Sequence, residues 1–201
     1  MTRPGQPSAS REEFETLRRT FQALDYDFGV QSAQVTRKMR EKGVAPPKGW
    51  MSLDHKPHSK VFQVGESRIG ILVFPPRPQN PGDYSRISEL ARTMGSDVSL
   101  LIGMSPWGAN QEQKFLRKRP EAVDILLGGG SGPPFKAKYP GSGETLWIRP
   151  YTEGKAVHSV SIPSLSTPEL GSADPNNDLD IRLLMLKDDI PQKPNIKEII
   201  R

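Results

Sequence analysis

The chain has 201 residues, of which 34% are hydrophobic and 25% are charged, and its net charge is +5. This length fits one domain of ordinary size, and we predict a single domain over residues 1–201 with its core at 11–163. The absence of cysteine excludes disulfides and thiolate metal sites, and no apolar stretch approaches the roughly 20 residues that span a bilayer. We therefore expect no transmembrane segment. The chain as written is expected to be soluble and cytoplasmic, and its positive charge favours anionic partners.

The first sixty residues predict two helices and one short strand. Ser10-Arg11-Glu12-Glu13 is a capping box that opens the first helix. A short strand is expected at Tyr26–Val30. A second helix is expected at Ser32–Lys42, with Gly43 as its C-terminal stop. The proline-rich stretch Val44–His58 is expected to be irregular surface.

Strands alternate with helices between residues 60 and 127. Lys60–Val64 and Arg68–Phe74 flank a three-residue loop that contains glycine, which predicts a hairpin. The elements that follow are a helix ending at Gly95, a strand at Asp97–Met104, a helix at Gln111–Arg119 and a strand at Asp124–Leu127. Connections of helical length between buried strands predict a parallel sheet. We therefore predict an α/β fold, a mixed sheet with a parallel centre flanked by helices on both faces.

The last fifty residues differ in character. Thr145–Arg149 and Val157–Ile162 are expected to form a second hairpin. Ser164–Asp178 is rich in Ser, Pro and Asn and is expected to be a loop. A late strand is expected at Asp180–Leu186, and Asn195–Arg201 is expected to begin a helix.

Three consecutive glycines, Gly128–Gly130, end the strand at Asp124–Leu127 and indicate a sharp turn. In open α/β sheets this carboxyl edge is where ligands bind. The backbone N–H groups there are expected to form a nest for a small anion such as phosphate or a nucleotide. The candidate binding residues are Gly129, Gly130, Ser131, Gly132, Ser105, Trp107, Arg149 and Tyr151. The alternative is a purely structural turn, with Trp107 and Tyr151 packed in the interior.

Several stretches together resemble the calcineurin-like metallophosphoesterases, in their 5′-nucleotidase branch. They are Leu24–Asp27 (LDYD), Ser67–Ile71 (SRIGI), Ser96–Gly103 (SDVSLLIG), Val123–Gly129 (VDILLGG), Thr145–Arg149 (TLWIR) and Gly154–Val157 (GKAV). The resemblance extends over Phe14–Ile162 and is strongest to the UDP-sugar-hydrolase-like (seleno)protein group. It implies a metallophosphoesterase fold and hydrolysis of phosphate esters with two divalent metals.

The residues at the family's metal positions differ from the expected ligands. Ser32–Gln34 stands where Gly-Asn-His is expected, Pro106 where a histidine is expected, and Gly130 where the family has Gly-Gly-His. The family's opening strand, which carries further ligands, is expected before residue 1. We therefore expect no metal cofactor, since these side chains are not ligands that divalent metals use. The weak alternative metal ligands are Asp54, His55 and His58.

Three functions remain open at this point. The first is a non-catalytic or repurposed anion-binding module that has lost the dimetal ligands. The second is a metal-dependent phosphate-ester hydrolase whose missing ligands lie before residue 1, which by resemblance would be extracytoplasmic. The third is a basic protein that binds polyanions, although no motif for specific nucleic-acid recognition is present. Without the opening strand, an exposed sheet edge is also expected, which is either covered by a loop or pairs two copies as a homodimer.

Overall fold

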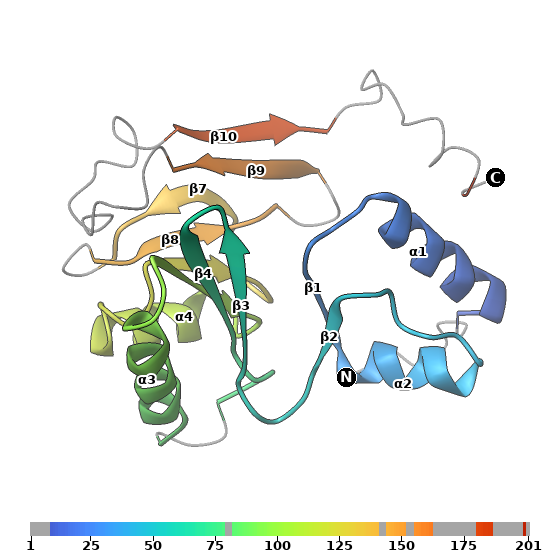
Figure 1. Cartoon of the computed structure of the whole chain (residues 1–201), viewed down its shortest axis with the longest axis horizontal. Coiled ribbons are helices and arrows are strands. Elements are labelled where there is room, and N and C mark those ends of the chain that lie inside the picture. The colour runs from blue at the N-terminus through green and yellow to red at the C-terminus, as the bar shows by residue number, and fades with distance from the viewer. Residues whose placement is uncertain are drawn as a thin grey trace. The chain divides into compact units, whose positions relative to one another are not determined.

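The computed structural model describes residues 9–78, 82–140, 144–151, 155–162, 180–186 and 199. The chain divides into two units, which are labelled by element in Figure 1. The first contains residues 1–54 and 189–201, and the second contains residues 55–188. The single domain over 1–201 stays a prediction. Within the described residues, no helix has the length and apolar character needed to cross a membrane.

The first unit contains two helices and a pair of parallel strands. Its elements are α1 (Arg11–Ala23), β1 (Gly29–Ser32), α2 (Ala33–Glu41) and β2 (Trp50–Leu53). The capping box of α1 is confirmed, because Glu13 N donates to Ser10 Oγ and Ser10 N donates to the Glu13 carboxylate. Gly43 follows α2 with a φ of 70°, as a C-terminal stop requires. Phe14, Met39 and Val44 form the buried core of this unit.

The expectation of irregular surface at Val44–His58 is wrong. Val44 is buried, and Trp50–Leu53 forms β2, which pairs in parallel with β1. The indole ring of Trp50 lies directly over Gly29, where a Cβ would approach it to 2.3 Å. A four-residue strand between prolines gives little signal of its own, because its pairing partner lies about twenty residues earlier in the sequence.

The second unit is built on a six-stranded sheet in the order β3-β4-β5-β6-β8-β7. Its strands are β3 (His58–Val64), β4 (Ser67–Val73), β5 (Leu100–Ser105), β6 (Ile125–Gly128), β7 (Phe135–Lys138) and β8 (Leu146–Arg149). The four central strands are parallel, and the edge strands β3 and β7 are antiparallel to their neighbours. The predicted mixed sheet with a parallel centre is confirmed.

The two faces of this sheet are covered differently (Figure 1). Helices α3 (Gly82–Gly95) and α4 (Ala109–Lys118) both pack on one face, where Ile87 and Phe115 meet Leu126. The other face packs against the antiparallel pair β9 (Ala156–Ser161) and β10 (Asp180–Met185). Within this unit the second face therefore carries strands where the sequence predicts helices.

The predicted hairpin of Thr145–Arg149 with Val157–Ile162 is also wrong. β8 lies between β6 and β7, and it runs parallel to β6. All four residues of β8 are buried, which is typical of a central parallel strand. β9 pairs instead with β10, which confirms the late strand at Asp180–Leu186. The predicted loop at Ser164–Asp178 lies outside the described residues, as does the predicted helix at Asn195–Arg201 apart from Ile199.

β3 forms one edge of the six-stranded sheet in the described part of the chain. Two apolar side chains on this strand, Val61 and Val64, are exposed. An exposed apolar edge is a template for pairing with another strand. Association of two copies at a sheet edge stays a prediction.

Candidate functional site

Two loops meet at the carboxyl edge of the parallel strands. One follows β5 and contains Ser105–Gly108, and the other follows β6 and contains Gly129–Pro134. Because β5 and β6 are parallel neighbours, both loops leave the sheet on the same side. Ala109 N, at the start of α4, donates to the backbone oxygen of Ser131 at 2.8 Å. The parallel direction of the two strands thus brings Ser105 and Gly129 to the same end of the sheet.

The glycine run is required by close packing and by backbone conformation. A Cβ at Gly128 would lie 2.3 Å from Glu112 Oε2 and 2.9 Å from Arg149 Cγ. Gly130 has a φ of 66°, and a Cβ there would lie 2.5 Å from the backbone oxygen of Pro106. Side chains are therefore excluded at both positions, by space at Gly128 and by both space and φ at Gly130.

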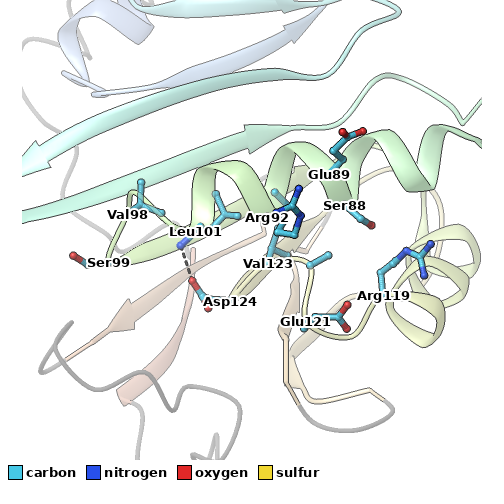
Figure 2. Close-up of a pocket in the computed structure, with 13 residues that line it drawn as sticks. Ser88, Glu89, Arg92, Val98, Ser99, Leu101, Arg119, Glu121, Val123 and Asp124 are labelled. Atoms are coloured by element: carbon cyan, nitrogen blue, oxygen red, sulfur yellow. Dashed lines mark hydrogen bonds between the residues drawn. The ribbon is translucent and has the colours of Figure 1, made fainter.

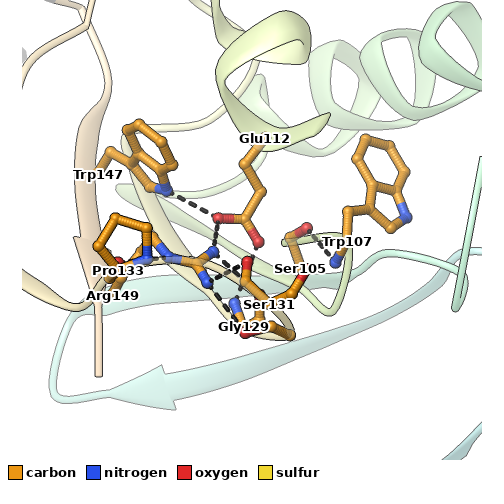
Figure 3. Close-up of polar contacts among 9 residues, drawn as sticks. Ser105, Trp107, Glu112, Gly129, Ser131, Pro133, Trp147 and Arg149 are labelled. Carbon is orange, nitrogen blue, oxygen red and sulfur yellow. Dashed lines mark hydrogen bonds and ion pairs between the residues drawn. The ribbon is translucent and has the colours of Figure 1, made fainter. Parts of the chain in front are cut away.

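The guanidinium of Arg149 lies against this turn, on the side of Glu112 (Figure 3). Its side chain is 3% exposed. Nε donates to Pro133 O at 3.2 Å, Nη1 donates to Gly129 O at 2.9 Å and to Glu112, and Nη2 donates to Gly130 O and Ser131 O. A guanidinium has five N–H groups, and all five are used in these bonds. Arg149 therefore holds the turn in place from inside the protein.

Glu112 balances the charge of Arg149. Its side chain is fully buried, and Oε2 accepts hydrogen bonds from Arg149 and from Trp147 Nε1, the latter at 3.0 Å. Oε1 accepts from Gly129 N at 3.1 Å. Glu112 is not among the residues that the sequence predicted for this site. A signal was present, because residue 112 lies on the same face of α4 as Phe115 and Leu116, which are also buried.

The carbonyl groups bound by Arg149 set the direction of the neighbouring N–H groups. In a trans peptide, the C=O of one residue and the N–H of the next point in opposite directions. The oxygens of Gly129, Gly130 and Ser131 point at the guanidinium, so the N–H groups of Gly130, Ser131 and Gly132 point away from it. Gly130, Ser131 and Gly132 are all exposed. In the described parts of the chain, none of these three N–H groups donates to another protein group.

The remaining predicted binding residues are Ser105, Trp107 and Tyr151, and each of them contacts protein groups. Ser105 is buried, and its Oγ accepts from Trp107 N at 3.2 Å. Trp107 is also buried, donates from Nε1 to Pro75 O at 2.7 Å and stacks on Tyr84. Tyr151 stacks on His158 of β9, with ring centroids 6.3 Å apart. Gly129–Gly132, Ser105, Trp107 and Arg149 thus come together at the turn, whereas the recorded stacking partner of Tyr151 belongs to β9.

The donor set at this edge does not fit the two divalent metals that the resemblance implies. Such metals need several carboxylate or imidazole ligands, and the carboxylate described here, Glu112, already accepts from three protein donors. Asp54 and His55 are exposed and His58 belongs to β3. Among the residues that the structure describes, no group of three or more His, Cys, Asp or Glu side chains is arranged to hold a metal.

Comparison with known proteins identifies the fold. No protein-family model matches the sequence, and no curated protein matches it. A proposed 5′-nucleotidase from Staphylococcus aureus, solved in complex with α-ketoglutarate, superposes with a TM-score of 0.60 and 14% identity, over 92% of this chain and 43% of the other. A 5′-nucleotidase precursor from Thermus thermophilus superposes with a TM-score of 0.58 and 15% identity, over 94% of this chain and 45% of the other.

This chain spans less than half the length of either solved protein. At these identities the likeness concerns the fold, and it agrees with the parallel centre formed by β4, β5, β6 and β8. The chain thus shares its mixed α/β fold with these two solved proteins.

Proposed function

We propose that this chain is a metallophosphoesterase-fold module that binds a small phosphate-bearing anion at the turn 128–132 and does not hydrolyse it. The observation that carries the proposal is the set of outward N–H groups at Gly130, Ser131 and Gly132. The carbonyl oxygens of the same three peptide bonds accept hydrogen bonds from Arg149, which lies on the inner side of the turn. Successive backbone N–H groups in a glycine-rich turn form concavities that bind anions.

The electrostatics of the turn support a backbone site. Arg149 and Glu112 neutralise each other, so the Glu112 carboxylate does not require a further cation as a partner. The start of α4 contributes partial positive charge beside Ser131, because the unsatisfied N–H groups of a helix lie at its N-terminus. Gly108 precedes this helix and provides no side-chain cap. A terminal phosphate, with several acceptor oxygens, complements these donors better than a neutral ligand does.

The absence of hydrolysis in the proposal follows from the chemistry of the side chains at this edge. Metal-assisted phosphate-ester hydrolysis needs side chains that hold the metals and position the attacking water. Three of the described side chains at the turn are buried and engaged, because Ser105 accepts from Trp107 and Glu112 is paired with Arg149. Ser131 is exposed and provides a hydroxyl beside the N–H groups.

Titration of the full chain with inorganic phosphate and with AMP, followed by amide NMR, tests the binding. We expect the amide signals of Gly130, Ser131 and Gly132 to move. Gly130→Ala should abolish these shifts, since the Cβ would displace the turn. Gly65→Ala is the matched control, because Gly65 has a similar φ of 59° but lies in the β3–β4 turn, with open space around its Cβ position.

Two results would contradict the proposal. If phosphate and AMP leave the amides of 130–132 unmoved in the wild-type chain, the turn has only a structural role. If the chain hydrolyses p-nitrophenyl phosphate when manganese is added, and Gly65→Ala retains that activity while Gly130→Ala loses it, the turn belongs to a hydrolase.

A further inference from the structure

A hollow lies at the amino ends of the parallel strands in the same sheet, at the end opposite the glycine turn (Figure 2). Its volume is about 550 Å³, within the range of roughly 300–1,000 Å³ in which proteins bind small molecules. Asp124 immediately precedes β6 and Ser99 immediately precedes β5, so the hollow opens at the amino ends of the parallel strands. It is therefore separate from the glycine turn, which lies at their carboxyl ends.

The floor of this hollow is apolar. Ala91 of α3, Leu101 of β5 and the neighbouring Ala122 and Val123 line it, and all four are buried. Val98 completes this surface and is half-buried. The floor thus provides a place for an aliphatic or aromatic group, because apolar surface removed from water by a ligand stabilises the complex.

Charged side chains of both signs surround the floor. They are Glu89 and Arg92 of α3 and Arg119, Glu121 and Asp124 of the segment before β6. In the part of the chain that the structure describes, none of the five forms an ion pair. Figure 2 shows the guanidinium of Arg92 above the floor, and the carboxyl of Asp124 at the floor beside Leu101. Opposite charges that face one hollow without pairing are available to a ligand.

Asp124 is the most enclosed of these charged groups. Its Oδ2 accepts from Leu101 N at 2.6 Å, and its backbone N donates to Leu101 O at 3.0 Å. Burial raises the pKa of this carboxyl above its usual range. A carboxylate in this position is best complemented by a cationic donor that arrives with the ligand, since loss of water is costly unless a partner replaces it.

We propose that this hollow binds a small zwitterion with an apolar body, of the size and chemistry of an apolar α-amino acid. The ligand's ammonium group pairs with Asp124, and its carboxylate accepts from Arg92, whose planar guanidinium matches a carboxylate with two hydrogen bonds. Its apolar side chain lies on Val98 and Leu101. The proposal does not depend on the function of the glycine turn.

Amide NMR of the full chain tests this with three related probes. Leucine carries both charges, leucinamide lacks the carboxylate, and N-acetylleucine lacks the ammonium group. We expect leucine to move the amide signals of Ser99, Leu101 and Val123. Each derivative should bind more weakly by about tenfold or more, the effect of losing one charge-assisted hydrogen bond.

Two variants assign the contacts. Arg92 is exposed, so Arg92→Gln should leave the fold intact and weaken leucine binding by about tenfold. Arg86→Gln is the control, because Arg86 is an exposed arginine of the same helix that does not line the hollow. The proposal is overturned if leucine moves none of the three amides, if N-acetylleucine binds as tightly as leucine, or if Arg92→Gln binds leucine as the wild type does.

Discussion

Arg149 and Glu112, which lie 37 residues apart in the sequence, form an ion pair in which both side chains are buried. The pair joins the end of β8 to the first turn of α4 and closes the glycine turn between them. A cation at a strand end would ordinarily be available to a ligand. Here its charge is satisfied within the protein, and the turn's backbone is what faces outward.

The first prediction concerns this pair. Removing one partner leaves an uncompensated buried charge, so Glu112→Gln should lower the free energy of unfolding by about 3–5 kcal/mol. Urea unfolding measures the loss. Arg182→Gln is the control, because Arg182 pairs with Asp180 in an exposed position and should give no measurable change. Equal unfolding midpoints for wild type and Glu112→Gln would show that the pair does not hold the turn.

The second prediction concerns Gly128. A methyl group there would press on Glu112 Oε2 and Arg149 Cγ, so Gly128→Ala should destabilise the fold by about 1–3 kcal/mol through overpacking. Gly95→Ala provides the comparison, since nothing lies within 4 Å of its Cβ position at the end of α3. That variant should be neutral or more stable, because alanine reduces the entropy of the unfolded chain. Equal unfolding midpoints for the two variants would exclude close packing as the reason for Gly128.

The third prediction concerns pH and Asp124. Burial raises the pKa of this carboxyl in the folded state, so above about pH 3.9 the unfolded chain loses its proton first. Asp124 therefore costs stability as pH rises through the interval between the two pKa values. Asp124→Asn keeps an oxygen for Leu101 N and cannot ionise. Its melting temperature should exceed that of the wild type by an amount that grows between about pH 4 and about pH 7.

Asp97→Asn is the control for this measurement, because Asp97 is exposed at the same edge of the sheet. Its melting temperature should follow that of the wild type across the series. If the difference in melting temperature between Asp124→Asn and the wild type becomes smaller as the pH rises, the prediction is wrong.

The parallel centre of the sheet could be predicted from the sequence because its strands are continuous apolar runs separated by connections of helical length. Arg68–Phe74 and Asp97–Met104 carried that pattern and are parallel neighbours, as β4 and β5. β2 could not be predicted, since four residues between prolines are defined by pairing with β1. The turn residues that follow Thr145–Arg149 in the sequence predict a hairpin. In the structure Leu146–Arg149 is buried on both sides and forms the inner strand β8, which pairs in parallel with β6.

The sequence predicts where the site lies in the fold better than it predicts which side chains contact each other there. The meeting of Ser105 and Gly129 follows from strand direction alone. That Arg149 faces inward could not be predicted, because its partner Glu112 lies on α4, 37 residues earlier in the sequence. A sequence pattern shows which residues reach an edge, but pairing between distant side chains decides which of them remain available.

The last prediction concerns His158 of β9. Both ring nitrogens are buried and, among the described residues, have no hydrogen-bond partner. Burial lowers the pKa of the imidazole in the folded state, so below about pH 6.5 the unfolded chain takes up the proton first. The wild type should therefore lose stability as pH falls through that value. His158→Phe keeps a ring to stack on Tyr151 and cannot be protonated.

Thermal melts at about pH 8 and about pH 5.5 measure this effect, since the two values lie on either side of the unfolded histidine pKa. The melting temperature of His158→Phe should exceed that of the wild type by more at the lower pH. His55→Gln is the control, because His55 is exposed, and it should track the wild type at both values. If His158→Phe and the wild type lose the same stability on acidification, the imidazole of His158 is protonated in the folded protein as readily as in the unfolded chain, and its buried nitrogens have no influence on the pH dependence of the fold.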